Sequence, residues 1–384
     1  MKKIFALTML AAASMQHAYA VDIKAGDWTV GIGGIVNAYY TVVSCKGGAV
    51  GGLALGSQGI GCGGQDDRTT IGNGLLPNGL VASAASTQGG YDVKALIGIY
   101  NSTATDSAIG QNSVVDVRQA FFTFGNADIG TIKLGRDYGI FGADAILSDM
   151  TLLGAGAPVQ ATQRGRVTLG HIGAGYTYLG NYGQIAYSSP KSASGIGVAL
   201  GLMSPVADTP VIAGSTYTAD SSPQLQGQVT YAAEGLKVWL GAKTQKFDSV
   251  TPGVADLTMR GVEVGASYNA GAFGALANVQ SGKGMGILSD ADQGDVKSTN
   301  YLAQGTFKAT EKVKLGVSYG VSENDNNAVG TGGLKSNANL TLGAYYTLNS
   351  VITLVAEVGQ TRSRGFNGST ARMNGGALGG IIFF

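Results

Sequence analysis

The sequence predicts an all-β protein, a transmembrane antiparallel β-barrel of sixteen strands. Its 384 residues are 44% hydrophobic and only 13% charged, whereas soluble domains are about 25% charged. The first residues form an export signal, and no later run of about 18 apolar residues is present, so membrane-spanning helices are not expected. Apolar residues alternate instead with polar ones, which is the period of a strand with one apolar face.

Residues 1–20 have the three parts of a secretory signal peptide. Lys2 and Lys3 supply the positive start, Ile4–Ala13 the apolar stretch, and Ala18-Tyr19-Ala20 the cleavage site. We expect the mature chain to begin at Val21 and residues 21–384 to form a single barrel domain. Losing two lysines changes the formal net charge from +1 to −1. A near-neutral chain is not expected to bind nucleic acid.

The first strand, 28–43, shows the alternation most clearly. Its even positions run from Trp28 through Ile32 and Val36 to Tyr40, while its odd positions are more polar. Later runs repeat this pattern, and in 91–100 the charged Lys94 falls on the polar face. A lysine facing lipid at mid-membrane would cost about 2–4 kcal/mol. The polar faces, rich in Gln, Asn and Thr, therefore suit a water-filled lumen.

Sixteen such runs follow one another along the chain. They are 28–43, 79–87, 90–101, 113–125, 130–137, 174–189, 195–206, 222–233, 236–247, 257–270, 272–283, 297–309, 312–323, 336–348, 351–362 and 371–384. The number is even, as in bacterial barrels, and short turns alternate with longer polar loops, as between periplasmic and outer ends. The second run, 79–87, consists almost entirely of small residues.

A long connection without a strand pattern follows the fifth run, at about 138–165. A loop of roughly thirty residues is usually functional or disordered. This one carries apolar residues that need a surface to pack against, namely Ile140, Phe141, Ile146, Leu147, Met150, Leu152 and Leu153. We therefore expect the third loop to fold into the barrel and narrow it.

These residues also carry a family resemblance. The run ADIGTIKLGRDYG from Ala127, with Ser148-Asp149-Met150, resembles the fifth strand and constriction loop of the trimeric, sixteen-stranded diffusion porins of Gram-negative outer membranes. NYGQIAYSSP from Asn181 and SGIGVALGLM from Ser194 resemble the hairpin that follows, and the final Phe384 also fits. The resemblance implies a homotrimer in outer-membrane lipid that passively admits small hydrophilic solutes and ions. A substrate-selective channel and a barrel enzyme are the alternatives.

The resemblance also implies a charged constriction. Arg136 matches the wall arginine of the family, and Asp149 matches an acid of the constriction loop. Opposed charges across a narrow gap would create a transverse field that orients polar solutes. Asp144 and Arg118 are additional candidates. Arg164 and Arg166 either return to the wall or remain solvated loop residues.

Two features depart from the family pattern. Many relatives have a second loop acid where this chain has Leu153, and the basic residues expected on the second and sixth strands are missing. We therefore expect weaker charge selection, or selection by other residues. The two-residue period of the strand also predicts that Arg136 does not face the lumen. If Ile132 and Leu134 face outward, alternation turns Arg136 outward too, unless a bulge at Gly135 re-aims it.

The only two cysteines, Cys45 and Cys62, are predicted to form one disulfide in an exported protein. Closing a loop of about 15 residues this way is worth roughly 3 kcal/mol in the chain-entropy model. It would tie the first long loop. A redox or metal-binding pair is the alternative interpretation.

The residues offer little for catalysis. His171 is the only histidine after the signal peptide, so neither a multi-histidine metal site nor a His-paired catalytic cluster is expected, and no cofactor is predicted. The glycine run 59–64 matches a dinucleotide-binding spacing but lacks the strand before it and the helix after it. The terminal Phe384 resembles the signal read by outer-membrane assembly machinery, or simply ends a hydrophobic strand.

Overall fold

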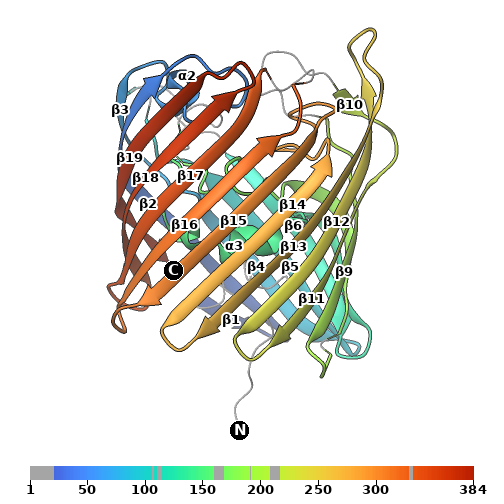
Figure 1. The fold of residues 1–384 in the computed structure, drawn as a ribbon. Helices are drawn as coiled ribbons and strands as arrows, with labels where there is room; N and C mark the ends of the chain where they lie inside the picture. The colour runs from blue at the N-terminus through green and yellow to red at the C-terminus, as the bar shows by residue number, and fades with distance from the viewer. Residues whose placement is uncertain are drawn as a thin grey trace.

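The described strands form one closed antiparallel sheet (Figure 1), and sixteen of them make up the barrel wall. The computed structural model describes residues 21–105, 108–109, 115–159, 168–190, 192–207, 217–327 and 332–384. The barrel strands are β2 (Trp28–Gly47), β4 (Asn78–Gln88), β5 (Tyr91–Asn101), β6 (Asp116–Asn126), β7 (Gly130–Tyr138), β8 (Asn181–Ser188), β9 (Ile196–Met203), β11 (Gln224–Ala233), β12 (Leu236–Ser249), β13 (Leu257–Ala270), β14 (Phe273–Lys283), β15 (Lys297–Lys308), β16 (Val313–Asn324), β17 (Leu334–Thr347), β18 (Ile352–Gly365) and β19 (Thr370–Phe383). Each pairs with its neighbours in sequence, and β19 closes the ring by pairing with β2. The predicted fold class is confirmed.

Three short strands were not predicted because they are too brief to show a period. They are β1 (Val21–Ala25), β3 (Asp67–Gly72) and β10 (Tyr217–Ala219). β1 pairs with the start of β2, just beyond the point where β19 ends at the Phe383–Ile35 pair. β3 and β10 likewise pair with parts of β2 and β12 that lie beyond the ends of β4 and β11. These short strands fill gaps in the wall.

The largest boundary error concerns the predicted strand 174–189. The strand begins only at Asn181, and residues 174–180 belong to the preceding loop. Gly180 takes a left-handed conformation, φ +70°, which breaks the extended chain just before β8. The predicted signal peptide and the first two residues of the predicted strand 113–125 lie outside the described residues.

The predicted alternation is confirmed along β2. The outward Val36 and Tyr40 are 50% and 48% exposed, whereas the inward Tyr39 and Thr41 are 1% and 3% exposed. The same contrast separates outward Leu225 from inward Gln226 on β11. The wall is thus apolar outside and largely polar inside. No helix among the described residues is long and apolar enough to span a membrane.

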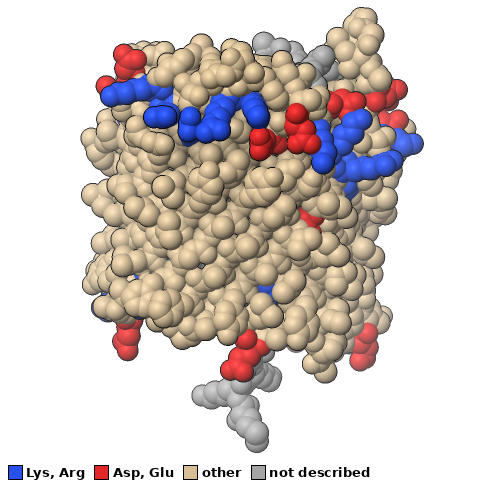
Figure 2. Space-filling view, viewed as in Figure 1, with Lys and Arg blue, Asp and Glu red and all other residues tan. Residues whose placement is uncertain are grey.

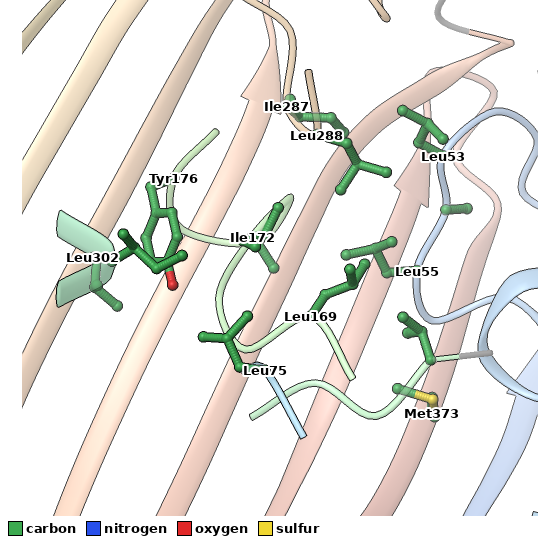
Figure 3. Packing of buried hydrophobic residues seen from close by; sticks show 14 of the residues in the cluster. Leu53, Leu55, Leu75, Leu169, Ile172, Tyr176, Ile287, Leu288, Leu302 and Met373 are labelled. Atoms are coloured by element: carbon green, nitrogen blue, oxygen red, sulfur yellow. The ribbon is translucent and has the colours of Figure 1, made fainter. Parts of the chain in front are cut away.

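Short turns and long loops segregate to opposite ends of the barrel (Figure 1). Several of the long loops fold inward and pack against one another, as Figure 3 shows. The shared cluster contains Leu53 and Leu55 of the first loop, Leu75 before β4, Leu169, Ile172 and Tyr176 of the third loop, Ile287 and Leu288 between β14 and β15, and the wall residues Leu302 and Met373. The predicted Cys45–Cys62 disulfide is present and joins β2 to the end of the short helix α2 (Gln58–Gly61).

Candidate functional site

The third loop, 139–180, is here called the constriction loop, and its described residues pack inside the barrel. It begins with helix α3 (Ala143–Ser148) and the 3-10 turn η1 (Met150–Leu153), and α3 is visible within the ring of strands in Figure 1. Five of the seven apolar residues that predicted an inward fold are buried, with Ile140 and Phe141 at 2% and 1% exposure, and Leu147 and Leu153 are half-buried. Residues 160–167 of the loop lie outside the described residues.

Inward-facing amides of the wall bind the backbone of this loop. Gln226 of β11 accepts hydrogen bonds from the N–H groups of Ile140 and Phe141, at 2.7 and 2.9 Å. Gln304 of β15 accepts from Met150 N at 2.8 Å and donates to Ser148 O at 2.7 Å. Polar side chains that predicted a wet lumen therefore satisfy buried loop backbone groups instead. Further contacts with the loop backbone come from Gln280 on β14, Ser322 on β16 and Asn337 on β17.

A buried carboxylate, Glu357 of β18, fixes the middle of the loop. Its Oε2 accepts hydrogen bonds from the backbone N–H groups of Ala155 and Gly156, both at 2.7 Å. Its Oε1 accepts from the Tyr345 hydroxyl at 2.5 Å. Charge-assisted hydrogen bonds of this kind are about twice as strong as neutral ones. The loop thus contacts the inner side of the wall from β11 to β18. It also contacts β2, where the Tyr39 hydroxyl donates a hydrogen bond to Leu153 O.

The two predicted loop acids face the loop and its supporting wall. Asp144 pairs with Lys237 of β12. Asp149 accepts hydrogen bonds from Thr151 N at 2.9 Å and from the Tyr176 hydroxyl at 2.7 Å. Both acids are buried, at 6% and 4% exposure. Each carboxylate is therefore compensated where it lies, and neither supports the opposed-charge arrangement that the family resemblance implied.

Arg118 of β6 lies inside the barrel, on the side opposite the wall strands that bind the constriction loop. The pairing of β5 with β6 shifts register between Gly98 and Tyr100, which places an extra residue in β6 beside Arg118. Arg118 Nε donates to Asp116 Oδ2 at 2.7 Å. Its guanidinium lies near Tyr138, the last residue of β7, and near Tyr178, close to the end of the constriction loop. Arg118 is thus buried inside the barrel, near the residues where the constriction loop begins and ends.

Arg136 requires a correction, because the structure places it on the outer wall. It pairs in register with Ala120 and Gly183 without any register shift at Gly135, so the bulge that would have turned it inward is absent. The side chain is exposed and donates to Val117 O at 3.4 Å. The strand period was the better guide to this residue than the family resemblance. Arg164 and Arg166 lie outside the described residues.

The same parity reveals inward residues that sequence reasoning missed. Lys133 and Asp137 of β7 have the opposite parity to Arg136, face inward and form an ion pair. Gln119 Nε2 donates to Asp137 Oδ1 at 2.9 Å, and Tyr100 donates to Gln119 Oε1. The inward wall of β5–β7 therefore carries a continuous polar network. The signal was present in the alternation of β7 and was overlooked in favour of Arg136.

The described residues contain no cluster of three or more His, Cys, Asp or Glu side chains that could hold a metal ion. His171 is a buried residue of the constriction loop, and its Nε2 lies 2.7 Å from Ser318 Oγ. Its second ring nitrogen, Nδ1, lies 3.2 Å from Ala174 O. Both ring nitrogens are thus used to position the loop against the wall.

Comparison with known proteins identifies the family. Residues 6–365 match the profile of the Gram-negative porins. The chain belongs to the Gram-negative porins. It is an outer-membrane channel of passive diffusion, as the family and this closed sixteen-stranded barrel together establish. No curated protein sequence matches it at a significant level.

Solved porin structures share the fold at low sequence identity. The outer membrane channel DcaP of Acinetobacter baumannii aligns with a TM-score of 0.70 and 16% identity, over 94% of this porin and 99% of that chain. The anion-selective porin of Comamonas acidovorans gives 0.64 and 18%, over 93% and 100%. Salmonella typhi OmpF, in complex with daunomycin, gives 0.61 and 17%, over 95% and 100%.

Proposed function

We propose that this porin is a general-diffusion channel with weak charge selection, open to small hydrophilic solutes and ions. One observation carries the proposal: four cations that face into the barrel each form an ion pair with a carboxylate on their own side of the bore. The pairs are Arg118–Asp116, Lys133–Asp137, Lys237–Asp144 and Lys243–Asp290. The predicted charges opposed across the gap, Arg136 and Asp149, do not form such a pair.

Local pairing weakens the field that a passing solute meets. The potential of a neutral ion pair falls off faster with distance than that of a single charge, and water in the bore screens it further. A transverse field needs cations on one wall and anions on the other. Here the four ion pairs are each neutral on one side of the bore, so the bore sorts solutes mainly by size.

Planar-bilayer recording of the refolded porin tests this proposal. In a tenfold KCl gradient, we expect a reversal potential near zero and a conductance roughly linear in salt concentration. A strongly cation- or anion-selective current would contradict weak charge selection. A closed bilayer, with the protein shown to be inserted, would contradict an open water-filled bore.

We further propose that this porin is exported by a cleaved signal peptide at residues 1–20 and works as a homotrimer in outer-membrane lipid. The residue pattern of the first twenty positions supports export. Solved porin trimers among the structural neighbours support the assembly, since one Vibrio cholerae OmpT structure is described as a trimer form. Conductance that rises in groups of three equal steps is the expected result. Single steps throughout would contradict the trimer.

A substrate-selective channel is the second candidate, because the structure gathers three tyrosines at Arg118. Tyr138 lies near Tyr100 and Tyr178, and Tyr138 and Tyr178 both lie near Arg118. The sequence showed only scattered tyrosines, since these residues come from β5, β7 and the far end of the loop. An aromatic group beside a guanidinium suits a planar anionic solute. Concentration-dependent block of the current by one such solute, lost in Arg118→Gln, would favour this candidate.

A further inference from the structure

The loop between β14 and β15, residues 284–296, folds into the barrel as a second inward loop. Most of its residues are buried, whereas connecting segments usually run over the surface of a protein. Asp292 accepts hydrogen bonds from the backbone N–H groups of 287–289, which fixes the shape of the loop. Ile287 and Leu288 pack in the cluster that the inward loops share (Figure 3). The β14–β15 loop is therefore a fixed part of the barrel interior.

Asp290, in the middle of this loop, binds wall strands other than the two that the loop connects. Its Oδ1 forms an ion pair with Lys243 of β12. Its Oδ2 accepts hydrogen bonds from Gln224 Nε2 of β11 at 2.8 Å and from the Tyr182 hydroxyl of β8 at 3.0 Å. The side chains of Asp290 and Lys243 are only 3% and 2% exposed. One buried carboxylate thus anchors the β14–β15 loop to three strands.

The wall residues that bind this carboxylate also hold the start of the constriction loop. Gln226 Nε2 donates to Gln224 Oε1. Gln226 Oε1 accepts hydrogen bonds from the N–H groups of Ile140 and Phe141. Lys243 Nζ lies 4.9 Å from the centre of the Phe141 ring, which is a cation–π distance. The two inward loops therefore share one anchor on the wall.

The return segment of the constriction loop rests on the β14–β15 loop directly. Tyr178 N donates to Leu288 O at 3.3 Å. The Leu288 side chain lies so close to Gly173 that a Cβ there would meet it at 2.5 Å. Gln293 Oε1 accepts from Asn324 Nδ2 of β16 at 3.0 Å, which holds the other side of the β14–β15 loop to the wall. The β14–β15 loop thus contacts the constriction loop near its end and shares an anchor with its start.

We infer that Asp290 is a positioning residue that sets the size limit of the channel. Its carboxylate holds the β14–β15 loop against the wall, and this loop keeps the constriction loop inside the bore. Removing one partner of a buried ion pair shifts an equilibrium by about a hundredfold or more. A shift of this size turns loops that are held inward about 99% of the time into loops released about half of the time. Released loops would admit larger solutes.

Liposome swelling with neutral sugars tests this inference, which rests on the proposed open bore. Neutral sugars do not respond to a charge that a variant adds or removes. With a monosaccharide and a trisaccharide as probes, we expect Asp290→Asn in the refolded full chain to raise the trisaccharide rate severalfold relative to the monosaccharide rate. The double variant Asp290→Asn, Lys243→Gln removes both charges and should raise the ratio too. It separates the loss of the anchor from a change of charge in the bore.

Asp290→Glu keeps the charge and should give a ratio closer to wild type than Asp290→Asn does. Asp295→Asn is the matched control, because Asp295 belongs to the same loop but forms a solvent-exposed ion pair with Lys283 at 2.8 Å. Exposed pairs contribute little to stability, so its ratio should equal that of wild type. If Asp290→Asn fails to refold, Tyr182→Phe supplies the test with a smaller increase, because it removes one donor to the carboxylate.

The Asp290 variants leave the outer surface of the barrel unchanged. On the face seen in Figure 2, charged side chains gather near the two ends of the wall and few lie across its middle. Asp290 is buried inside the wall and adds nothing to that surface. Insertion into liposomes should therefore equal that of wild type, and the swelling rates are compared at equal amounts of inserted porin.

Three results would overturn the inference. An unchanged sugar ratio in Asp290→Asn and in the double variant, with wild type open to the monosaccharide, would remove the role of Asp290 and leave the open channel intact. An equal increase in Asp295→Asn would show that any change in the β14–β15 loop has this effect. Absence of swelling with either sugar by inserted wild type would contradict the open bore itself, and the inference with it.

Discussion

At the scale of single residues, strand parity decides which charges reach the solute. Arg136 and Lys133 are three positions apart on β7, yet Arg136 is exposed on the outer wall while Lys133 pairs inward with Asp137. Parity is a stronger constraint than motif position because a residue on a regular strand has only two faces to choose from.

Comparing Arg136→Ser with Lys133→Ser tests that assignment. We expect Arg136→Ser to leave the reversal potential unchanged, since its charge is screened from the bore by the wall. Lys133→Ser should shift it toward cation preference because Asp137 loses its compensating cation. An uncompensated charge near a narrow passage is worth about 1 kcal/mol, or roughly fivefold in the permeability ratio. A larger shift from Arg136→Ser than from Lys133→Ser would place Arg136 in the lumen.

Asp292, in the loop between β14 and β15, has a role that depends on pH. Burial raises the pKa of Asp292 to about 6, although backbone N–H groups of Ile287, Leu288 and Ser289 donate to its carboxylate. A raised pKa means that the folded loop binds the proton more tightly than the unfolded one. This contribution to stability is therefore full below about pH 4 and is lost as the pH rises through 6.

Hydrogen exchange of the amides of 287–289 should show this dependence. After correction for intrinsic rates, we expect protection to decline between about pH 4 and pH 7. Asp292→Asn removes the titrating group and should give a flat profile over that range. If protection rises with pH in the unaltered porin, the pKa of Asp292 is lowered by folding, not raised.

At the scale of elements, the constriction loop depends on a few wall side chains that bind its backbone. Glu357→Gln removes the charge from two hydrogen bonds to Ala155 and Gly156 and should weaken the loop anchor by about 1–3 kcal/mol. We expect faster amide exchange at 155–156 and more frequent current fluctuations in bilayers. Glu323→Gln, which alters an exposed ion pair with Lys335, is the control and should change neither. If amide exchange at 155–156 is the same in Glu357→Gln as in the wild type, other contacts are enough to hold this part of the constriction loop.

The elements also show where sequence reasoning succeeded. The sixteen strands followed from the two-residue period, which is local and survives any tertiary context. The inward fold of the loop followed from its apolar residues. Its return segment 174–180 was misassigned to a strand, because Tyr176 and Thr177 alternate like strand residues while packing inside the barrel. The partners of Asp144 and Asp149 depend on contacts between distant segments, which no local pattern encodes.

At the scale of the whole molecule, the two ends of the chain close the wall together. Gly34 of β2 donates its N–H to Phe384 O at 2.7 Å, and Phe384 N donates to Gly34 O at 3.1 Å. The Phe384 side chain is 44% exposed. Backbone groups thus join β2 to the end of the chain, and the Phe384 ring lies against the backbone of Gly34.

Phe384→Ala tests whether the Phe384 ring contributes to barrel assembly in cells or to the stability of the folded barrel. The backbone pairing with Gly34 persists, so refolding in detergent and thermal stability should change by less than about 1 kcal/mol. If the ring is the feature read by the assembly machinery, the yield of barrel in the outer membrane of cells should fall severalfold. Normal yield in cells would assign the ring to an ordinary last strand.

The loops that meet inside the barrel share one dry cluster, while the surrounding wall is a closed ring of hydrogen bonds. These two parts respond differently to heat, because units held by few backbone bonds open below the global unfolding temperature. Warming should therefore unfold the loops inside the barrel first, while the strands of the wall stay paired. Unfolding of these loops would widen the bore, and a recording would show a sudden rise in current at a temperature well below that at which the barrel unfolds.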